Sequence, residues 1–126
     1  MNKYYFKKEV VNMDLEIKES FKDGYNRLVR FNNWCVAVAN GGKRFSKENF
    51  TKLERYLETD EVFVLLSGSG KLITGEEMKV RELEYKKLYN VKKGVWHGLI
   101  LEKNATVLII ENDDTSLDNT EYKNIT

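Results

Sequence analysis

The chain of 126 residues contains no proline, one cysteine (Cys35) and one histidine (His97). A single cysteine excludes an internal disulfide, and one cysteine with one histidine excludes the ligand clusters of zinc fingers. No apolar run approaches the roughly 18 residues that a membrane-spanning helix requires. We therefore expect a chain that is held together by one hydrophobic core rather than by cross-links, metal clusters or a bilayer.

The charge is nearly balanced, with 21 Lys and Arg against 20 Asp and Glu and a net charge of +1. This balance provides no strong field for nucleic acid or for an anionic membrane, so we expect neither as a partner. The opening stretch MNKYYFKKEVVNMDLEI lacks the long apolar centre of a signal peptide. We therefore expect a cytoplasmic protein.

Short apolar segments separated by turn signals dominate the rest of the chain. Asn32–Asn33, Ser67–Gly70 and Glu102–Ala105 each lie between two such segments, and we interpret these connections as hairpin turns. Many short strands at this spacing are typical of an all-β barrel or sandwich, which we assign as a single domain over residues 1–126. The segments that we expect to be strands include 28–31, 34–39, 62–66, 72–74, 95–101 and 106–110.

The sequence GSGK at Gly68–Lys71 raises the alternative of a phosphate-binding loop. Such a loop would need a glycine at position 65 and a hydroxyl residue at position 72, and both positions hold leucine. The segment that follows the glycines is strand-like, so no helix N-terminus is available for a phosphate. The glycines are better explained by a sharp turn between strands.

Two spaced motifs resemble those of the cupin superfamily. Glu61 is followed after six residues by Gly68, and Gly94-Val95-Trp96-His97 lies downstream at the separation of the second cupin motif. The resemblance covers about Thr51 to Asn112. Within it, the segment ERYLETDEVFVLLSG is similar to a group of small, single-domain bacterial cupins of largely unassigned activity. It implies a cupin-like double-stranded β-helix, also called a jelly-roll barrel, with a small-molecule pocket in its mouth.

The motifs depart from the cupin pattern where that pattern supplies metal ligands. The two histidines expected before Glu61 correspond to Glu54 and Tyr56, or, in the shorter register, to Arg55 and Leu57. Lys92 replaces the motif proline and Leu101 the motif asparagine. Of the usual three histidines and one glutamate, only Glu61 and His97 remain. We therefore predict no tightly held metal and no other cofactor.

Four residues are the candidates for the site. His97 titrates near neutrality and could act as a catalytic base with Glu61, while Tyr56, Glu61, His97 and Trp96 could bind the ligand. Each also has a structural explanation: His97 and Glu61 could be satisfied strand residues, and Trp96 could be a packing residue. Strand alternation allows only one of Arg55 and Tyr56 to face inward, and we favour Tyr56.

Two functions remain open from the sequence. The first is a barrel that binds a small polar ligand, such as a sugar or an organic acid, without a tightly held metal. The alternative is an enzyme, a lyase or isomerase in which His97 transfers a proton and Glu61 or Tyr56 orients the substrate. A pocket lined by His97 and Glu61 in hydrogen-bonding contact would favour the enzyme, whereas side chains that point to solvent or are held by main chain would favour the binding barrel. We also predict a homodimer, because the barrel need not bury the apolar stretch Tyr4–Phe6 with Val10–Val11 by itself.

Overall fold

The computed structural model describes residues 10–11, 14–115 and 118–126. Antiparallel strands make up nearly all of its regular structure, and one 3-10 turn, η1 (Lys47–Asn49), precedes β5. The strands are β1 (Val10–Val11), β2 (Glu16–Ile17), β3 (Gly24–Phe31), β4 (Trp34–Asn40), β5 (Lys52–Tyr56), β6 (Glu61–Ser67), β7 (Gly70–Thr74), β8 (Lys79–Glu82), β9 (Tyr89–Val91), β10 (His97–Leu101), β11 (Thr106–Asn112) and β12 (Thr120–Asn124).

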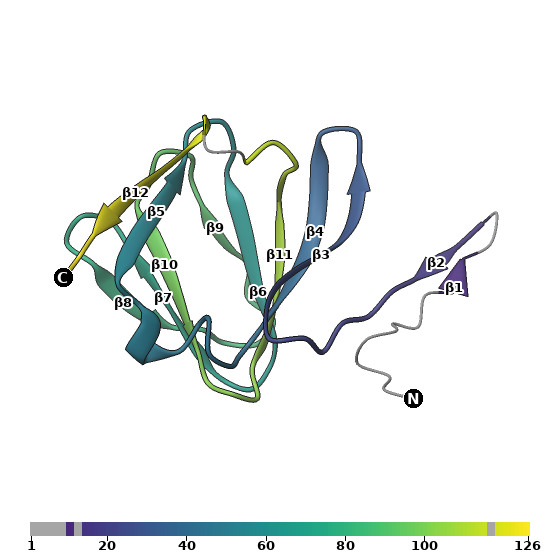
Figure 1. Ribbon diagram of the computed structural model, residues 1–126, viewed down its shortest axis with the longest axis horizontal. Coiled ribbons are helices and arrows are strands. Elements are labelled where there is room, and N and C mark those ends of the chain that lie inside the picture. Colours follow the sequence, from purple (N-terminus) through teal and green to yellow (C-terminus); the bar gives the residue numbers. More distant parts are fainter. Residues whose placement is uncertain (1–9, 12–13, 116–117) are drawn as a thin grey trace.

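Two five-stranded sheets form the barrel, in the orders β12-β5-β10-β7-β8 and β3-β4-β11-β6-β9. Figure 1 shows the two sheets facing each other, with the β1–β2 ribbon lying apart from them. A small amphipathic sheet must bury one face, and here each sheet buries its inner face against the other. The prediction of an all-β barrel agrees with this arrangement of two antiparallel sheets.

Two of the three predicted hairpins are wrong. Asn32–Asn33 does join paired strands, since β3 pairs with β4, and Asn32 adopts a positive φ of 53°. However, β6 pairs with β11 and β9, while β7 pairs with β10 and β8, so Ser67–Gly70 crosses between the sheets. Glu102–Ala105 crosses in the same way between β10 and β11. Short connections predict a turn, but the partner of each strand is decided by interactions that are distant in sequence.

The two crossing turns pack against each other at one end of the barrel. Gly68 has a φ of +73°, and a Cβ built on it would lie 2.6 Å from the Cα of Ala105. A side chain at this position would therefore be both strained and in collision with backbone. The glycine that suggested a phosphate loop is required instead by the close approach of the two turns.

The barrel interior is apolar near the crossing turns and polar at the other end. Along β6, Phe63 and Leu65 are buried below Glu61, and along β11, Val107 and Ile109 precede the buried Glu111. These positions alternate with outward-facing residues, as expected for strands of period two. β4 contributes only small side chains to the interior, namely Cys35, Ala37 and Ala39. The space beside Glu111 is therefore not filled by β4.

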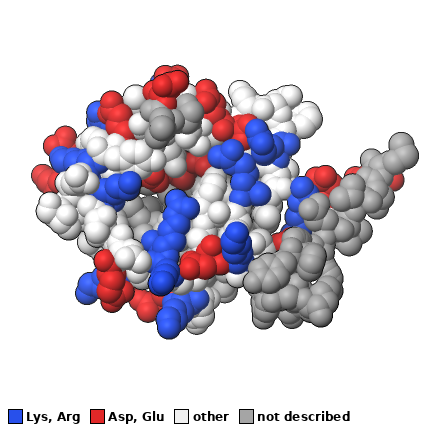
Figure 2. Space-filling view, viewed as in Figure 1, with Lys and Arg blue, Asp and Glu red and all other residues white. Residues whose placement is uncertain are grey.

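The N-terminal ribbon is separate from both sheets, since β1 pairs only with β2. The apolar stretch Tyr4–Phe6 of the dimer prediction lies outside the described residues. Across the described residues, no helix has the length and apolar character needed to cross a membrane. Figure 2 shows acidic and basic side chains interspersed over the face that it presents.

Candidate functional site

A tight turn delivers His97 into the barrel. Gly94 has a φ of +82° and its N–H donates to the carbonyl of Tyr56 at 2.8 Å, which ties the turn to β5. The carboxylate of Asp60, next to Glu61 in the chain, accepts from the N–H of Lys93 at 2.9 Å. Because β10 begins at the residue after Trp96, the His97 side chain is the first to face the interior. The same loop anchors therefore position both His97 and Glu61.

His97 and Glu61 contact each other inside the barrel. Nε2 of His97 lies 2.8 Å from Oε1 of Glu61, and their side chains are only 3% and 4% exposed. The two atoms are close but are not aligned as a directed hydrogen bond. Nδ1 of His97 lies 3.1 Å from the carbonyl of Val95, which can only accept, so Nδ1 carries a proton and Nε2 faces the carboxylate.

The environment of His97 favours its charged form. Burial of the ring opposes the charge, but the adjacent Glu61 carboxylate outweighs burial, so the pKa of His97 is raised. A neutral ring would place a lone pair of Nε2 against a carboxylate oxygen at 2.8 Å. One proton on Nε2 removes that repulsion, and the pair is then an ion pair within the barrel.

Glu54 and Tyr56 on β5 lie beside this pair. Oε2 of Glu54 is 4.0 Å from Nε2 of His97, and the Tyr56 hydroxyl donates to the same oxygen at 3.4 Å. The rings of Tyr56 and His97 meet edge to face, with centroids 5.7 Å apart. Burial and the charge of Glu61 raise the pKa of the Glu54 carboxyl. Burial, followed by the Glu61 and Glu54 charges, also raises the pKa of Tyr56, so its phenol stays protonated.

A second buried carboxyl group lies behind Glu61. Glu111 on β11 is directly opposite Glu61 in the antiparallel register and is 4% exposed. The hydroxyl of Tyr25 on β3 donates to Oε2 of Glu111. Burial, and then the charge of Glu61, raise the pKa of Glu111 to about 8. The site therefore contains one carboxyl group that is neutral at pH 7 beside one that is paired with His97.

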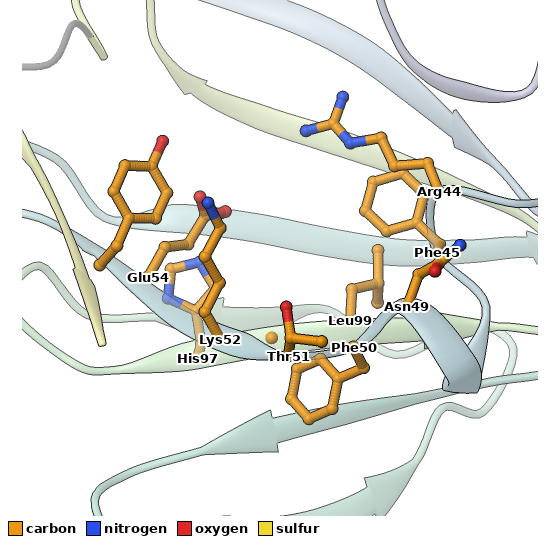
Figure 3. A pocket seen from close by; sticks show the side chains of 11 residues that line it. Arg44, Phe45, Asn49, Phe50, Thr51, Lys52, Glu54, His97 and Leu99 are labelled. Carbon is orange, nitrogen blue, oxygen red and sulfur yellow. The ribbon is translucent and has the colours of Figure 1, made fainter. Parts of the chain in front are cut away.

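These side chains line a cavity of about 150 Å³ between the two sheets. It adjoins a pocket of about 130 Å³ that shares Arg44, Glu54 and His97 with it. Figure 3 shows Glu54 and His97 at one end of this adjoining pocket and Arg44, Phe45 and Asn49 at the other, with the Arg44 side chain directed back over it. The hollow thus combines carboxyl groups and an imidazole with two cationic side chains, Arg44 and Lys52, in its lining.

The structure brings together three of the four residues that the sequence proposed. Glu61, Tyr56 and His97 line the same cavity. Trp96 is not among its lining residues, and its ring stacks instead against the Arg55 guanidinium, which lies 4.3 Å from the ring centroid. Arg55 also pairs with Glu121 of β12 at 2.6 Å. Alternation explains the difference, because Tyr56 and His97 face inward whereas Arg55 and Trp96 face outward.

Sequence reasoning missed Glu111 and Tyr25. Period-two alternation along β11 places Glu111 on the same face as Val107 and Ile109, and this pattern was the available signal for a buried acid. Tyr25 carries no comparable signal, since it precedes the apolar segment that marked its strand. Its contact with Glu111 depends on the long-range pairing of β3, β4 and β11.

The donor set does not fit a cupin metal centre. Within residues 10–11, 14–115 and 118–126, no three His, Cys, Asp or Glu side chains converge as a metal-binding group. Glu61 and His97 contact each other directly. Tyr56 replaces an imidazole with a phenol that stays protonated, and a protonated phenol is a poor ligand.

Comparisons with known proteins support the fold. No protein-family model and no curated protein matches the sequence. Three solved structures illustrate the likeness. A cupin-2 domain protein from Shewanella frigidimarina is 18% identical over 71% of this chain and 79% of its own, with a TM-score of 0.53. The QdtA 3,4-ketoisomerase from Thermoanaerobacterium thermosaccharolyticum, in complex with TDP, is 14% identical over 91% and 82%, with a TM-score of 0.58. Fe(II) HppE in complex with its substrate is 19% identical over 82% and 60%, with a TM-score of 0.58. At these identities the likeness establishes a cupin fold.

Proposed function

From the cupin fold and the contents of its cavity, we propose that the protein binds a small polar molecule and transfers a proton on it, as an isomerase or lyase. The observation that carries this proposal is the 2.8 Å contact between Nε2 of His97 and Oε1 of Glu61 within the cavity. A buried imidazole beside a carboxylate supports a proton-transfer site, because one group can donate and the other accept a proton. The ketoisomerase activity of QdtA is compatible with it.

The chemistry would begin with the His97–Glu61 ion pair. His97 can give its Nε2 proton to a carbonyl oxygen of the ligand, and Glu61 then no longer faces a cation and can accept a proton from a neighbouring carbon or hydroxyl. Reversal at the adjacent carbon completes an isomerisation. Tyr56, which stays protonated, would orient a ligand oxygen by donating a hydrogen bond.

The lining also restricts the ligand. The carboxyl groups of Glu54 and Glu61 line the inner cavity and favour ligand hydroxyl groups that can donate to them. Arg44, which lines both cavities, favours a carboxylate or another anionic substituent. A sugar, or a polyhydroxylated organic acid, has both kinds of group.

Hydrogen–deuterium exchange tests the activity even when the product of the reaction is not identified. Untagged protein is incubated in D2O with a panel of aldoses, ketoses, hydroxy acids and keto acids, and NMR follows C–H signals adjacent to carbonyl groups. We expect protein-dependent loss of such a signal for at least one compound, and no loss with His97→Gln. Glu82→Gln, an exposed change on β8, is the matched control and should exchange at the rate of the unchanged protein.

A binding barrel without catalysis is the second candidate. It is favoured by the position of Nδ1 of His97, which the carbonyl of Val95 holds at 3.1 Å. A compound that raises the melting temperature but shows no exchange would select this candidate. A panel in which no compound binds or exchanges would contradict both.

A homodimer and a cytoplasmic location are also part of this proposal. Several large apolar side chains on the outer face of the β3-β4-β11-β6-β9 sheet are exposed, including Phe31, Trp34, Leu66 and Ile110. A second copy of the chain would cover such a face. Light scattering at micromolar concentration tests the dimer, and a monomer mass would contradict it; cell fractionation tests the location.

A further inference from the structure

Three buried polar atoms in the site have no aligned hydrogen-bond partner: Oε1 of Glu61, Nε2 of His97 and Oε1 of Glu111. A proton on Nε2 of His97 serves Oε1 of Glu61, which lies 2.8 Å away, and leaves Oε1 of Glu111 without a donor. Glu61 and Glu111 are cross-strand partners on β6 and β11, and their side chains share the inner face of one sheet. Two ionised carboxylates on these neighbouring strands would repel each other in the buried interior, whereas a proton on Oε1 of Glu111 can be donated to the Glu61 carboxylate and removes that repulsion.

We propose that Glu111 is a proton-holding positioning residue, which shares one proton with Glu61 and so keeps the Glu61 carboxylate directed at His97. Tyr25 completes the arrangement because its hydroxyl donates to the other oxygen of Glu111, leaving Oε1 for Glu61. The chain of contacts then runs from Tyr25 through Glu111 and Glu61 to His97. The positioning role of Glu111 in catalysis rests on the proposed function, whereas the arrangement of Tyr25, Glu111 and Glu61 does not depend on it.

The groups that face Glu111 come from five strands and one loop, and they support a neutral Glu111. Glu61 on β6 opposes its charge. The Cys35 thiol on β4 stays neutral, because burial and then the charge of Glu111 raise its pKa. Tyr25 and Arg27 on β3 favour the charge of Glu111, but Arg27 is engaged by Asp113 at 3.1 Å. Glu54 and Tyr56 on β5, His97 on β10 and Arg44 in the loop between β4 and β5 line the same cavity as Glu111. With His97 charged, Glu61 ionised and Glu111 neutral, the three groups together carry no net charge.

For catalysis, the site then holds two protons beside Glu61, one on His97 and one on Glu111. At every stage in which Glu61 is ionised, the Glu111 proton prevents two adjacent negative charges. Glu111 acts through Glu61 and does not need to touch the ligand. Its role is therefore positioning rather than direct participation in bond breaking.

The only histidine of the chain makes this arrangement measurable. The imidazole Cε1–H of His97 is a single NMR resonance in untagged protein, and 13C-labelled glutamate reports the carboxyl carbon of Glu111. We expect the Glu111 carboxyl to titrate near pH 8 and the His97 resonance to show a second inflection at the same pH. Glu111→Gln should remove that inflection. Tyr25→Phe should move it to higher pH, because the Tyr25 hydrogen bond lowers the pKa of Glu111.

The outcomes separate this inference from the proposed function, because the titrations use ligand-free protein. Infrared spectra at pH 7 should show the C=O band of a protonated carboxylic acid that is missing in Glu111→Gln and present in the Glu82→Gln control. A Glu111 carboxyl that titrates near 4.5, or a His97 curve with one step that Glu111→Gln does not alter, would overturn the proposal. If Glu111→Gln does not fold, two measurements still test whether Glu111 holds a proton. They are the carboxyl titration of the unchanged protein and the shift of that titration in Tyr25→Phe.

Discussion

Glu111 should lower the stability of the protein at neutral pH, and replacing it should raise that stability. In the unfolded chain its carboxyl group ionises with an ordinary pKa of 4.5, whereas in the folded barrel the pKa is about 8. Between these values the folded state binds a proton that the unfolded state does not. The free energy of unfolding therefore falls as pH rises through this window, and the contribution of Glu111 is most favourable below pH 4.5.

The size of the effect follows from the two pKa values. Each unit of difference is worth about 1.4 kcal/mol, so the penalty at pH 7 is about 3 kcal/mol and at pH 5 less than about 1 kcal/mol. Glu111→Gln keeps the shape, can still accept from Tyr25 and can donate an N–H to Glu61. It removes the ionisable group, so we expect it to stabilise the protein by up to about 3 kcal/mol at pH 7.

Urea denaturation at several pH values measures this gain, with Glu82→Gln as the control for loss of a surface carboxylate. The advantage of Glu111→Gln should grow by about 1.4 kcal/mol for each pH unit between 5 and 8 and then level off. A variant that is less stable than the unchanged protein at pH 7, or whose advantage is the same at pH 5 and pH 8, would refute the assignment of a neutral Glu111. The stabilised variant should also be impaired in exchange, as expected where a functional group opposes stability.

Three further predictions concern the pH dependence, the turns and metal. The pKa of His97 is raised above 6.5, so its stabilising contribution is complete below that pH and is lost as pH rises through the folded-state value. The urea midpoint of the unchanged protein should therefore fall between pH 6 and pH 9, and a midpoint that rises would contradict the ion pair. Gly68→Ala should cost at least about 1 kcal/mol through its positive φ, with a further loss from collision with Ala105. Gly75→Ala, which has a φ of +84° but no atom nearer than 4.0 Å, should lose less, and equal losses would argue against the collision. Untagged, dialysed protein should carry well under one transition metal per chain, and zinc should raise its melting temperature little; elemental analysis that finds about one tightly held metal would reverse this expectation.

The sequence predicted the features that depend on local pattern and motif spacing. Alternation and turn residues identified most of the strands, and the spacing of Glu61 and His97 predicted a cupin fold with both residues near one pocket. It could not predict which strands pair, because the turn at Ser67–Gly70 would look the same in a hairpin as in a crossing between sheets. Tyr25 was missed for the same reason, since its contact with Glu111 exists only once β3, β4 and β11 lie side by side. Alternation along β11 did indicate that Glu111 is buried.

The crossing turns also determine when during folding the pocket can exist. They send β6 and β7, and likewise β10 and β11, into opposite sheets, so each strand finds its partners far along the chain. Topologies dominated by such distant pairings fold slowly. The cavity collects Tyr25, Tyr56, Glu61, His97 and Glu111 from five strands, and β11 follows the other four in the chain. Without β11 the chain would have neither Glu111 nor the strand that separates β4 from β6, so the cavity can form only when the barrel is complete. A ligand present in the cell would then stabilise finished molecules selectively over partly folded ones.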